Sequence, residues 1–348
     1  MVVPRLFSFP WLGRSGNMRH PRHMGFQYSP NPNCPFKDHL DDGDTHCYSY
    51  FDDNSGYDVL AENVSGHAGW LADIGGVEFD DIVPTSTPDL LLPPYIPALP
   101  KGGSKALLAG NQPPIVAVFL CDIVSAKLHR YPTSLKERFG LSGDTKIILF
   151  AYGKDQLIED LWPKRDDFYD QVQRLGFDLV TGINYSVWHT QPHEERLVNV
   201  KRSLITFSEM QKRGIPAIPH IYWSGEKDLA RWADWLNHYP FVGIVAVDLQ
   251  TEKKLKGWNE AVDELALYLL PKLDHDVRFI ITGPSRSKKI RRLTTLLGGS
   301  LTVSNKDVAI SSLAHQDLRI DGNSHDRYIP ISSAIHFRSN LKFFSALI

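Results

Sequence analysis

Two titratable side chains stand at the ends of short apolar runs in the second half of the chain. Asp248 ends the run that begins at Ile244, and His220 ends the proline-stiffened run that begins at Ile215. A carboxylate at a buried strand end loses hydration, so its pKa can be tuned for service as a base or nucleophile. A histidine there could carry protons or ligate a metal. We therefore take Asp248 as the candidate base or nucleophile and His220 as its proton partner. The alternatives are a loop-capping aspartate and a core imidazole.

Other polar and aromatic side chains lie at further predicted strand ends or in the loops that follow them. The loop 184–193 is rich in side chains that both stack and hydrogen-bond, which suits a sugar or a base. Trp223, beside Tyr222, adds a flat stacking surface. The predicted ligand-binding residues are Asp122, Asn184, Tyr185, Trp188, His189, Trp223, Gln250, Ser285, Arg286 and Asn305.

The segment Gly283–Arg286 is a candidate anion site. It lies between a predicted strand and a helix that we expect to begin near Ser285, where backbone donors could hold a phosphate. Ser285 could instead only cap that helix. The helix continues with four basic residues, Lys288, Lys289, Arg291 and Arg292. Such a face could contact a nucleic-acid backbone, but more often it is simply solvated.

A metal site and the common cofactor motifs have weak support. Cys34, His39, His46 and Cys47 are zinc-ligand types, but their spacing matches no standard finger and adjacent ligands strain tetrahedral geometry. We therefore assign no metal ligands. The sequence contains no Walker loop, no Rossmann glycine triplet and no nucleophile elbow, which argues against the corresponding enzyme classes. The cofactor stays unassigned.

These residues must be positioned by short strands that alternate with helices from Pro114 onward. The predicted strands are 115–121, 146–152, 177–181, 217–222, 244–249, 277–282 and 300–304. The clearest predicted helices are 193–213, 228–238 and 258–273. This alternation predicts an α/β fold with a parallel sheet. Because the units are short and regular, we favour a parallel (β/α) barrel, which could be incomplete or distorted, over an open doubly wound sheet. An eighth strand would come from Val77–Val83 or from the segment after Ala314.

The predicted organisation has three parts. Residues 1–113 form an irregular, proline- and glycine-rich region, and residues 84–100 within it should be extended because each proline ring fixes φ. Residues 114–316 form the barrel-like domain. Residues 317–348 form a C-terminal tail that either caps the barrel or is loosely ordered.

Composition limits the partners and the compartment. A net charge of −2 provides no global field for nucleic acid or acidic membranes. Three cysteines cannot form a disulfide framework, and their odd number argues for a reducing compartment. The sequence contains no long apolar run, so we expect a cytoplasmic protein without a membrane partner. The oligomeric state is left open.

Several segments in order resemble a known but uncharacterised group. They include Asn184–Trp188, Asn199–Ser203, Gly214–His220, Val245–Thr251 and Ile280–Pro284. In these segments the chain is similar to the DUF4417-like proteins, a domain of unknown function found on many plasmids and phages. The resemblance covers roughly residues 115–318. It implies no catalytic residues, because none is assigned for that group.

Our leading hypothesis is a barrel enzyme that acts on a phosphorylated, nucleotide-like or sugar-like ligand. The alternative is a nucleic-acid-associated accessory protein of a plasmid or phage, without turnover, that uses Arg14, Arg19, Arg22 and the helix 286–292. A third hypothesis is a scaffold for protein contacts, with residues 84–100 as the docking strip. Small-molecule and nucleic-acid partners therefore both stay open.

Overall fold

The computed structural model describes residues 71–85, 88, 90–102, 104–125, 134–187, 193–250, 255–318 and 332–348. The chain divides into two compact units. The first comprises Met1–Glu78 and Trp188–Val198, and the second comprises Phe79–Val187 and Asn199–Ile348. All eight strands and most predicted site residues belong to the second unit.

The strands of the second unit form two four-stranded sheets in which every neighbouring pair is parallel. Their orders are β1-β8-β7-β6 and β2-β3-β4-β5. The strands are β1 (Tyr95–Pro97), β2 (Ile115–Phe119), β3 (Lys146–Phe150), β4 (Leu179–Thr181), β5 (Ala217–Ile218), β6 (Ile244–Asp248), β7 (Arg278–Thr282) and β8 (Leu301–Asn305). Two isolated parallel bridges, Ala98↔Ala117 and His220↔Ala246, connect edge positions of the two sheets.

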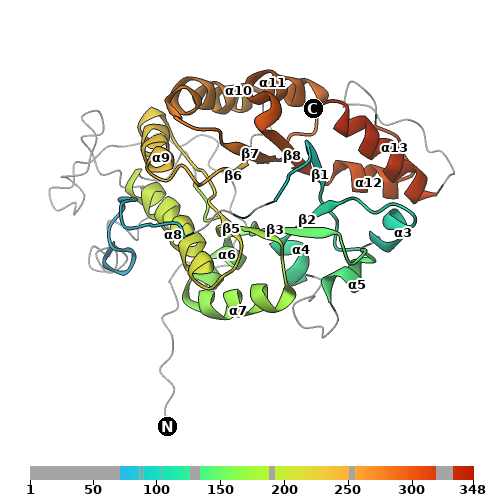
Figure 1. Ribbon diagram of the computed structural model, residues 1–348, viewed down its shortest axis with the longest axis horizontal. Helices are drawn as coiled ribbons and strands as arrows, with labels where there is room; N and C mark the ends of the chain where they lie inside the picture. Colours follow the sequence, from blue (N-terminus) through green and yellow to red (C-terminus); the bar gives the residue numbers. More distant parts are fainter. Residues whose placement is uncertain are drawn as a thin grey trace, which may run out of the picture. The chain divides into compact units, whose positions relative to one another are not determined.

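Helices follow the strands along the chain and lie outside them in the second unit (Figure 1). The α-helices are α3 (Ser104–Leu108), α4 (Leu120–Ser125), α5 (Leu135–Phe139), α6 (Asp155–Leu161), α7 (Arg165–Leu175), α8 (His193–Lys212), α9 (Glu226–His238), α10 (Leu255–Glu264), α11 (Ser287–Leu297), α12 (Asp307–Leu313) and α13 (Ser333–Ser345). Among the described residues, no helix is long and apolar enough to cross a membrane.

Strands β1 to β7 send alternate side chains into two different apolar clusters. In β2, Val116 and Val118 join the larger cluster, which also contains buried helix residues. Ile115, Ala117 and Phe119 join a second cluster that contains residues of both sheets. Because both faces of such a strand are buried, its sequence is a continuous apolar run. The second cluster therefore lies between the two sheets, and inward-facing residues can be identified by their two-residue spacing.

The seven strands expected from the sequence are confirmed, most of them shorter than the predicted run; β5 keeps only two residues, and β8 has the predicted length but starts one residue later. The predicted source of the eighth strand was wrong, because β1 comes from the proline-rich segment. Tyr95 pairs with Val303 of β8, more than 200 positions away. Proline has no backbone N–H to donate, but Pro94 still pairs with β8 because its carbonyl accepts a hydrogen bond from the Val303 amide at 2.8 Å. Within the segment predicted to be extended, the three residues Tyr95–Pro97 therefore form a paired, buried strand.

The end of the chain contains a packed helix. In α13, Phe337 and Phe344 are buried, and the Asn340 side chain bonds the Leu318 amide and the Gln316 carbonyl. The expected helix 258–273 is more complex than predicted. It continues α10 as a π-helix, Leu265–Leu269, and ends in a 3₁₀ turn at Leu270–Lys272, where the ring of a proline limits further helix.

Candidate active site at the carboxyl ends of the strands

Asp248 is the central charged group of the candidate site. It ends β6 and shares a face with Ile244 and Ala246, which belong to the cluster between the sheets. One carboxylate oxygen, Oδ1, accepts from Thr282 Oγ1 at 2.7 Å and from the Gln250 amide at 3.0 Å. The surrounding protein removes water from this carboxyl, and burial raises its pKa although these hydrogen bonds oppose the shift.

The second carboxylate oxygen of Asp248 is less engaged. Oδ2 accepts a long hydrogen bond, 3.4 Å, from the side-chain amide of Asn184, which follows β4. A carboxylate oxygen can accept two hydrogen bonds, so Oδ2 keeps capacity for a ligand proton. Asp248 therefore combines one oxygen fixed by the protein with one oxygen available for chemistry.

A glycine holds the loop beside Asp248 in place. Gly283, directly after β7, has φ of +103°. A Cβ at this position would lie 2.6 Å from the Gln250 backbone nitrogen, which is closer than real Cβ atoms come. Only glycine fits both the backbone angle and the close approach. This contact brings the two loops after β6 and β7 together, and it explains why the predicted ligand residue Gln250 contributes its backbone amide.

His220 lies in the same layer as Asp248 but is not hydrogen-bonded to it. Its backbone bridges to Ala246, its side chain is 1% exposed, and neither ring nitrogen has a hydrogen-bond partner among the described residues. Burial lowers the pKa of His220 to about 3, so the imidazole is neutral at neutral pH. A neutral ring offers one donor and one acceptor. The structure therefore favours hydrogen bonding over the predicted role as proton carrier.

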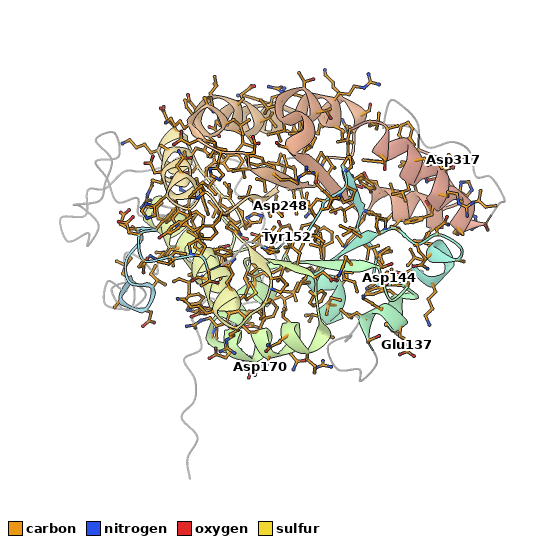
Figure 2. All side chains as sticks on the ribbon, viewed as in Figure 1. Glu137, Asp144, Tyr152, Asp170, Asp248 and Asp317 are labelled. Atoms are coloured by element: carbon orange, nitrogen blue, oxygen red, sulfur yellow. The ribbon has the colours of Figure 1, made fainter. Side chains whose placement is uncertain are left out.

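Two tyrosines pack against His220. Tyr152 meets the imidazole edge-on at a ring-centre distance of 5.0 Å, and Tyr222 lies at 4.1 Å. The Tyr222 hydroxyl has no hydrogen-bond partner in the part of the chain that the structure describes, whereas the Tyr152 hydroxyl interacts with the side chain of Thr282. Burial, and then the nearby charge of Asp248, raises the pKa of both phenols. They are therefore protonated donors, and Figure 2 shows Tyr152 beside Asp248 in the interior.

Ser304 completes this layer. It is fully buried in β8 opposite Thr282, and its hydroxyl also has no partner among the described side chains and backbone groups. The sequence placed Tyr152 at a strand end and Tyr222 beside Trp223, but neither was among the predicted ligand-binding residues, and Ser304 was not selected. For Tyr152 the available signal was its two-residue spacing from the inward-facing Ile148 and Phe150.

Trp223, a predicted ligand-binding residue, directly follows Tyr222 in the chain. Its indole nitrogen donates to Glu264 Oε2 at 2.7 Å, and Glu264 is the last residue before the π-helix. Trp223 is half-buried and packs against the larger apolar cluster. Glu264 therefore sets the orientation of the indole.

Tyr185 is not brought to Asp248, although it follows Asn184 directly. Its buried ring lies under the Arg202 guanidinium at 3.9 Å and beside Trp162 at 5.8 Å, in the larger cluster with the helices. Arg202 in turn binds Glu159 through both of its terminal nitrogens. Successive residues after the strand face opposite sides, so the structure separates two predicted site residues that are adjacent in sequence.

Asp122 and Asn305 lie near the site with structural partners. Asp122 forms an ion pair with Lys306 at 2.5 Å, and the Lys306 ammonium lies 4.5 Å from the ring centre of Phe119. Asn305 accepts from the Tyr95 hydroxyl at 3.0 Å and donates to the Pro284 carbonyl at 2.7 Å. Its amide therefore ties β1 and the loop after β7 to β8.

The candidate anion segment differs from expectation at the helix start. The helix α11 begins at Ser287 with Arg286 as its N-cap, so Ser285 is not the cap. Arg286 is exposed and its side chain makes no capping hydrogen bond. Lys289 and Arg292 pack over Trp258 of α10 at 5.0 and 6.0 Å. This packing favours an intramolecular role for part of the basic face over nucleic-acid contact.

The remaining predicted residues lie outside the described residues. They are Trp188, His189, Arg14, Arg19, Arg22, Cys34, His39, His46 and Cys47. Within the described ranges, no three histidine, cysteine, aspartate or glutamate side chains gather as a metal-binding group. Comparison of the chain with models of known families and with curated proteins returns no match. The resemblance to the DUF4417-like group therefore stays a prediction, and residue roles must be argued from geometry.

Proposed function

We propose that the two sheets close into one eight-stranded (β/α) barrel whose strands follow each other in chain order. The two bridges support this closure. The Leu99 amide donates to the Ala117 carbonyl at 2.8 Å, and the Ile221 amide donates to the Ala246 carbonyl at 2.8 Å. The apolar cluster shared by both sheets is the core expected inside such a barrel. In a barrel, inward-facing residues at the carboxyl ends of the strands converge on one site.

We further propose that the protein is an enzyme that uses Asp248 for general acid–base chemistry on a sugar-like, nucleotide-like or phosphorylated ligand. One observation carries this proposal. A carboxyl of raised pKa lies beside Tyr152 and Tyr222, in a buried group in which the polar atoms of His220, Tyr222 and Ser304 have no partner within the described chain. Buried polar groups are normally hydrogen-bonded, and an unpaired one costs about 1–3 kcal/mol. Such a concentration is typical of a site that is completed by a ligand.

The proposed roles follow from the protonation states. Asp248 accepts a proton from a hydroxyl of the ligand, or from a carbon beside a carbonyl, at its less engaged Oδ2. The protonated phenols of Tyr152 and Tyr222 donate hydrogen bonds to the ligand oxygen on which negative charge develops. His220 orients the ligand as a neutral hydrogen-bonding group. Thr282 and the Gln250 amide hold Asp248 in position.

The test is a thermal-shift screen of sugars, sugar phosphates, nucleotides and divalent metals, followed by NMR detection of turnover for each binder. A ligand bound at 100 times its Kd stabilises the folded state by about 2.7 kcal/mol, which raises the melting temperature. Asp248→Asn should stay folded, retain no turnover, and lose most of the ligand-dependent shift. Asp144→Asn is the matched control, because Asp144 is exposed and precedes β3 at its other end. Equal shifts and equal turnover in Asp248→Asn and wild type would contradict the proposal.

A further inference from the structure

The polar groups around Asp248 also indicate which part of a ligand they accept, and this inference rests on the proposed function. The layer consists of two phenols, an imidazole, an alcohol and an amide, from Tyr152, Tyr222, His220, Ser304 and Asn184. The tyrosines are protonated and the histidine is neutral, for the reasons given above. Among these groups, Asp248 is therefore the one that carries a negative charge when its carboxyl ionises.

A phosphate or carboxylate placed against this layer would face a carboxylate in a poorly hydrated environment. Two like charges in such a site disfavour each other strongly unless a cation separates them. Lys306, which directly follows β8, is paired through its ammonium with Asp122 at 2.5 Å. The ligand surface that contacts Asp248 should therefore carry no negative charge. Any anionic group of the ligand would lie farther out, near the exposed Arg286.

The hydrogen-bonding capacity of the layer matches hydroxyl groups. A hydroxyl both donates and accepts, and so do a phenol and a serine alcohol, while a neutral imidazole does each through a different nitrogen. The Asp248 Oδ2 atom accepts only, and it would take the proton of a ligand hydroxyl. Neighbouring hydroxyls on one ring could meet these groups together.

The orientation of the rings favours a puckered ligand over a planar base. Tyr152 is perpendicular to His220, with an interplanar angle of 89°, and Tyr222 is tilted from His220 by 39°. A planar base is usually held between roughly parallel faces or against one. Tyr152 instead provides a ring at right angles to His220, and the C–H groups of a chair-shaped ligand ring could pack on such a face while its hydroxyls reach the polar atoms.

We infer that the site holds an uncharged cyclic polyol, such as the sugar moiety of a larger substrate, with its hydroxyls on Asp248 Oδ2 and on the phenols of Tyr152 and Tyr222. The geometric basis is the convergence of unpartnered neutral donors and acceptors on one half-engaged carboxylate. A free monosaccharide, a glycoside and an inositol share this chemistry.

The inference can be tested with three sets of probes on the full chain. Ligand-observed NMR and calorimetry would measure neutral monosaccharides with myo-inositol, free nucleobases, and inorganic phosphate. At least one cyclic polyol should bind, and the Tyr152→Phe and Tyr222→Phe variants should each weaken that binding about tenfold, the effect of losing one hydrogen bond of about 1.4 kcal/mol. Tyr268→Phe is the control, because Tyr268 lies in the π-helix, away from Asp248 along the chain.

The outcomes separate this inference from the proposed function. Binding of nucleobases or phosphate without any polyol would refute the polyol assignment, while Asp248-dependent turnover of another ligand would leave the proposed enzyme intact. Polyol binding that is unchanged in both tyrosine variants would also refute the assignment. Polyol binding without turnover, with normal weakening in the variants, would support the assignment and contradict catalysis. A complete lack of polyol binding overturns the inference.

Discussion

The neutral, buried His220 makes the stability of the protein depend on pH in a way that one substitution should remove. Its pKa falls from an ordinary 6.5 to about 3 in the folded state. At His220, the unfolded chain binds a proton near pH 6.5 and the folded chain does not. The contribution of His220 to stability is therefore fully present above that pH and is lost as the pH falls toward 3. At about 1.4 kcal/mol for each pH unit, the total effect is at most about 5 kcal/mol. Between pH 7 and pH 5 it is about 2 kcal/mol.

The substitution is His220→Leu, which removes both the titration and two buried nitrogens that have no partner among the described residues. Leucine has a similar volume and needs no hydrogen bond, so the variant should be at least as stable as wild type at pH 7. Urea unfolding at pH 7 and pH 5 would measure both proteins. The wild type should lose about 2 kcal/mol more than the variant between these two pH values.

Two comparisons make this measurement decisive. The pKa of Asp248 is raised, so its contribution to stability changes with pH in the opposite direction to that of His220. The contribution of Asp248 is present at low pH, where its carboxyl is protonated, and is lost as the pH rises through its folded pKa. Subtracting the variant from wild type removes this background. His238→Asn, a change at an exposed side chain at the end of α9, is the control substitution and should unfold like wild type at both pH values. Equal losses in wild type and His220→Leu would refute the claim that His220 is held neutral.

Two further substitutions test the backbone that positions the site. Gly283→Ala should destabilise the protein by about 2 kcal/mol or more in urea unfolding, because φ of +103° and a 2.6 Å approach to Gln250 both oppose a Cβ. The control is Gly299→Ala, where a Cβ meets nothing within 4 Å, and it should change stability by less than about 1 kcal/mol. Equal effects of the two substitutions would contradict the close contact at Gly283. Ile96→Ala in β1 should lower the free energy of unfolding by about 2–5 kcal/mol, because Ile96 is fully buried. The control is Leu91→Ala, which should leave stability nearly unchanged because Leu91 is 89% exposed. No loss of stability in Ile96→Ala would mean that β1 is not part of the core.

The elements that carry the site were largely predictable from local sequence. Runs such as Ile244–Asp248 are apolar throughout because a strand with two buried faces excludes polar side chains except at its ends. A polar residue at such an end, Asp248 or His220, is therefore conspicuous, and their catalytic roles stay predictions. The helix ending near Gly214 was equally clear, because glycine accommodates its φ of +75° there.

Other features were invisible because they depend on contacts between distant segments. Strand β1 is three residues long and consists of Tyr95, Ile96 and Pro97, so nothing in its own pattern distinguishes it from an extended loop. Its pairing with β8 makes it a strand. The proline-rich composition correctly predicted extended backbone, but only long-range hydrogen bonds decided that this backbone lies in the core.

The sequence by itself determined the alternation of strands and helices and the polar residues at the strand ends, since these follow from periodicity and burial along the chain. Tertiary structure alone decided which of those residues meet. It turned Asn184 toward Asp248 and Tyr185 toward Arg202, and it left His220 neutral between two tyrosines. The reason is physical: the direction of a side chain beyond a strand, the number of its hydrogen-bond partners and the pKa of a buried group all depend on neighbours contributed by other strands.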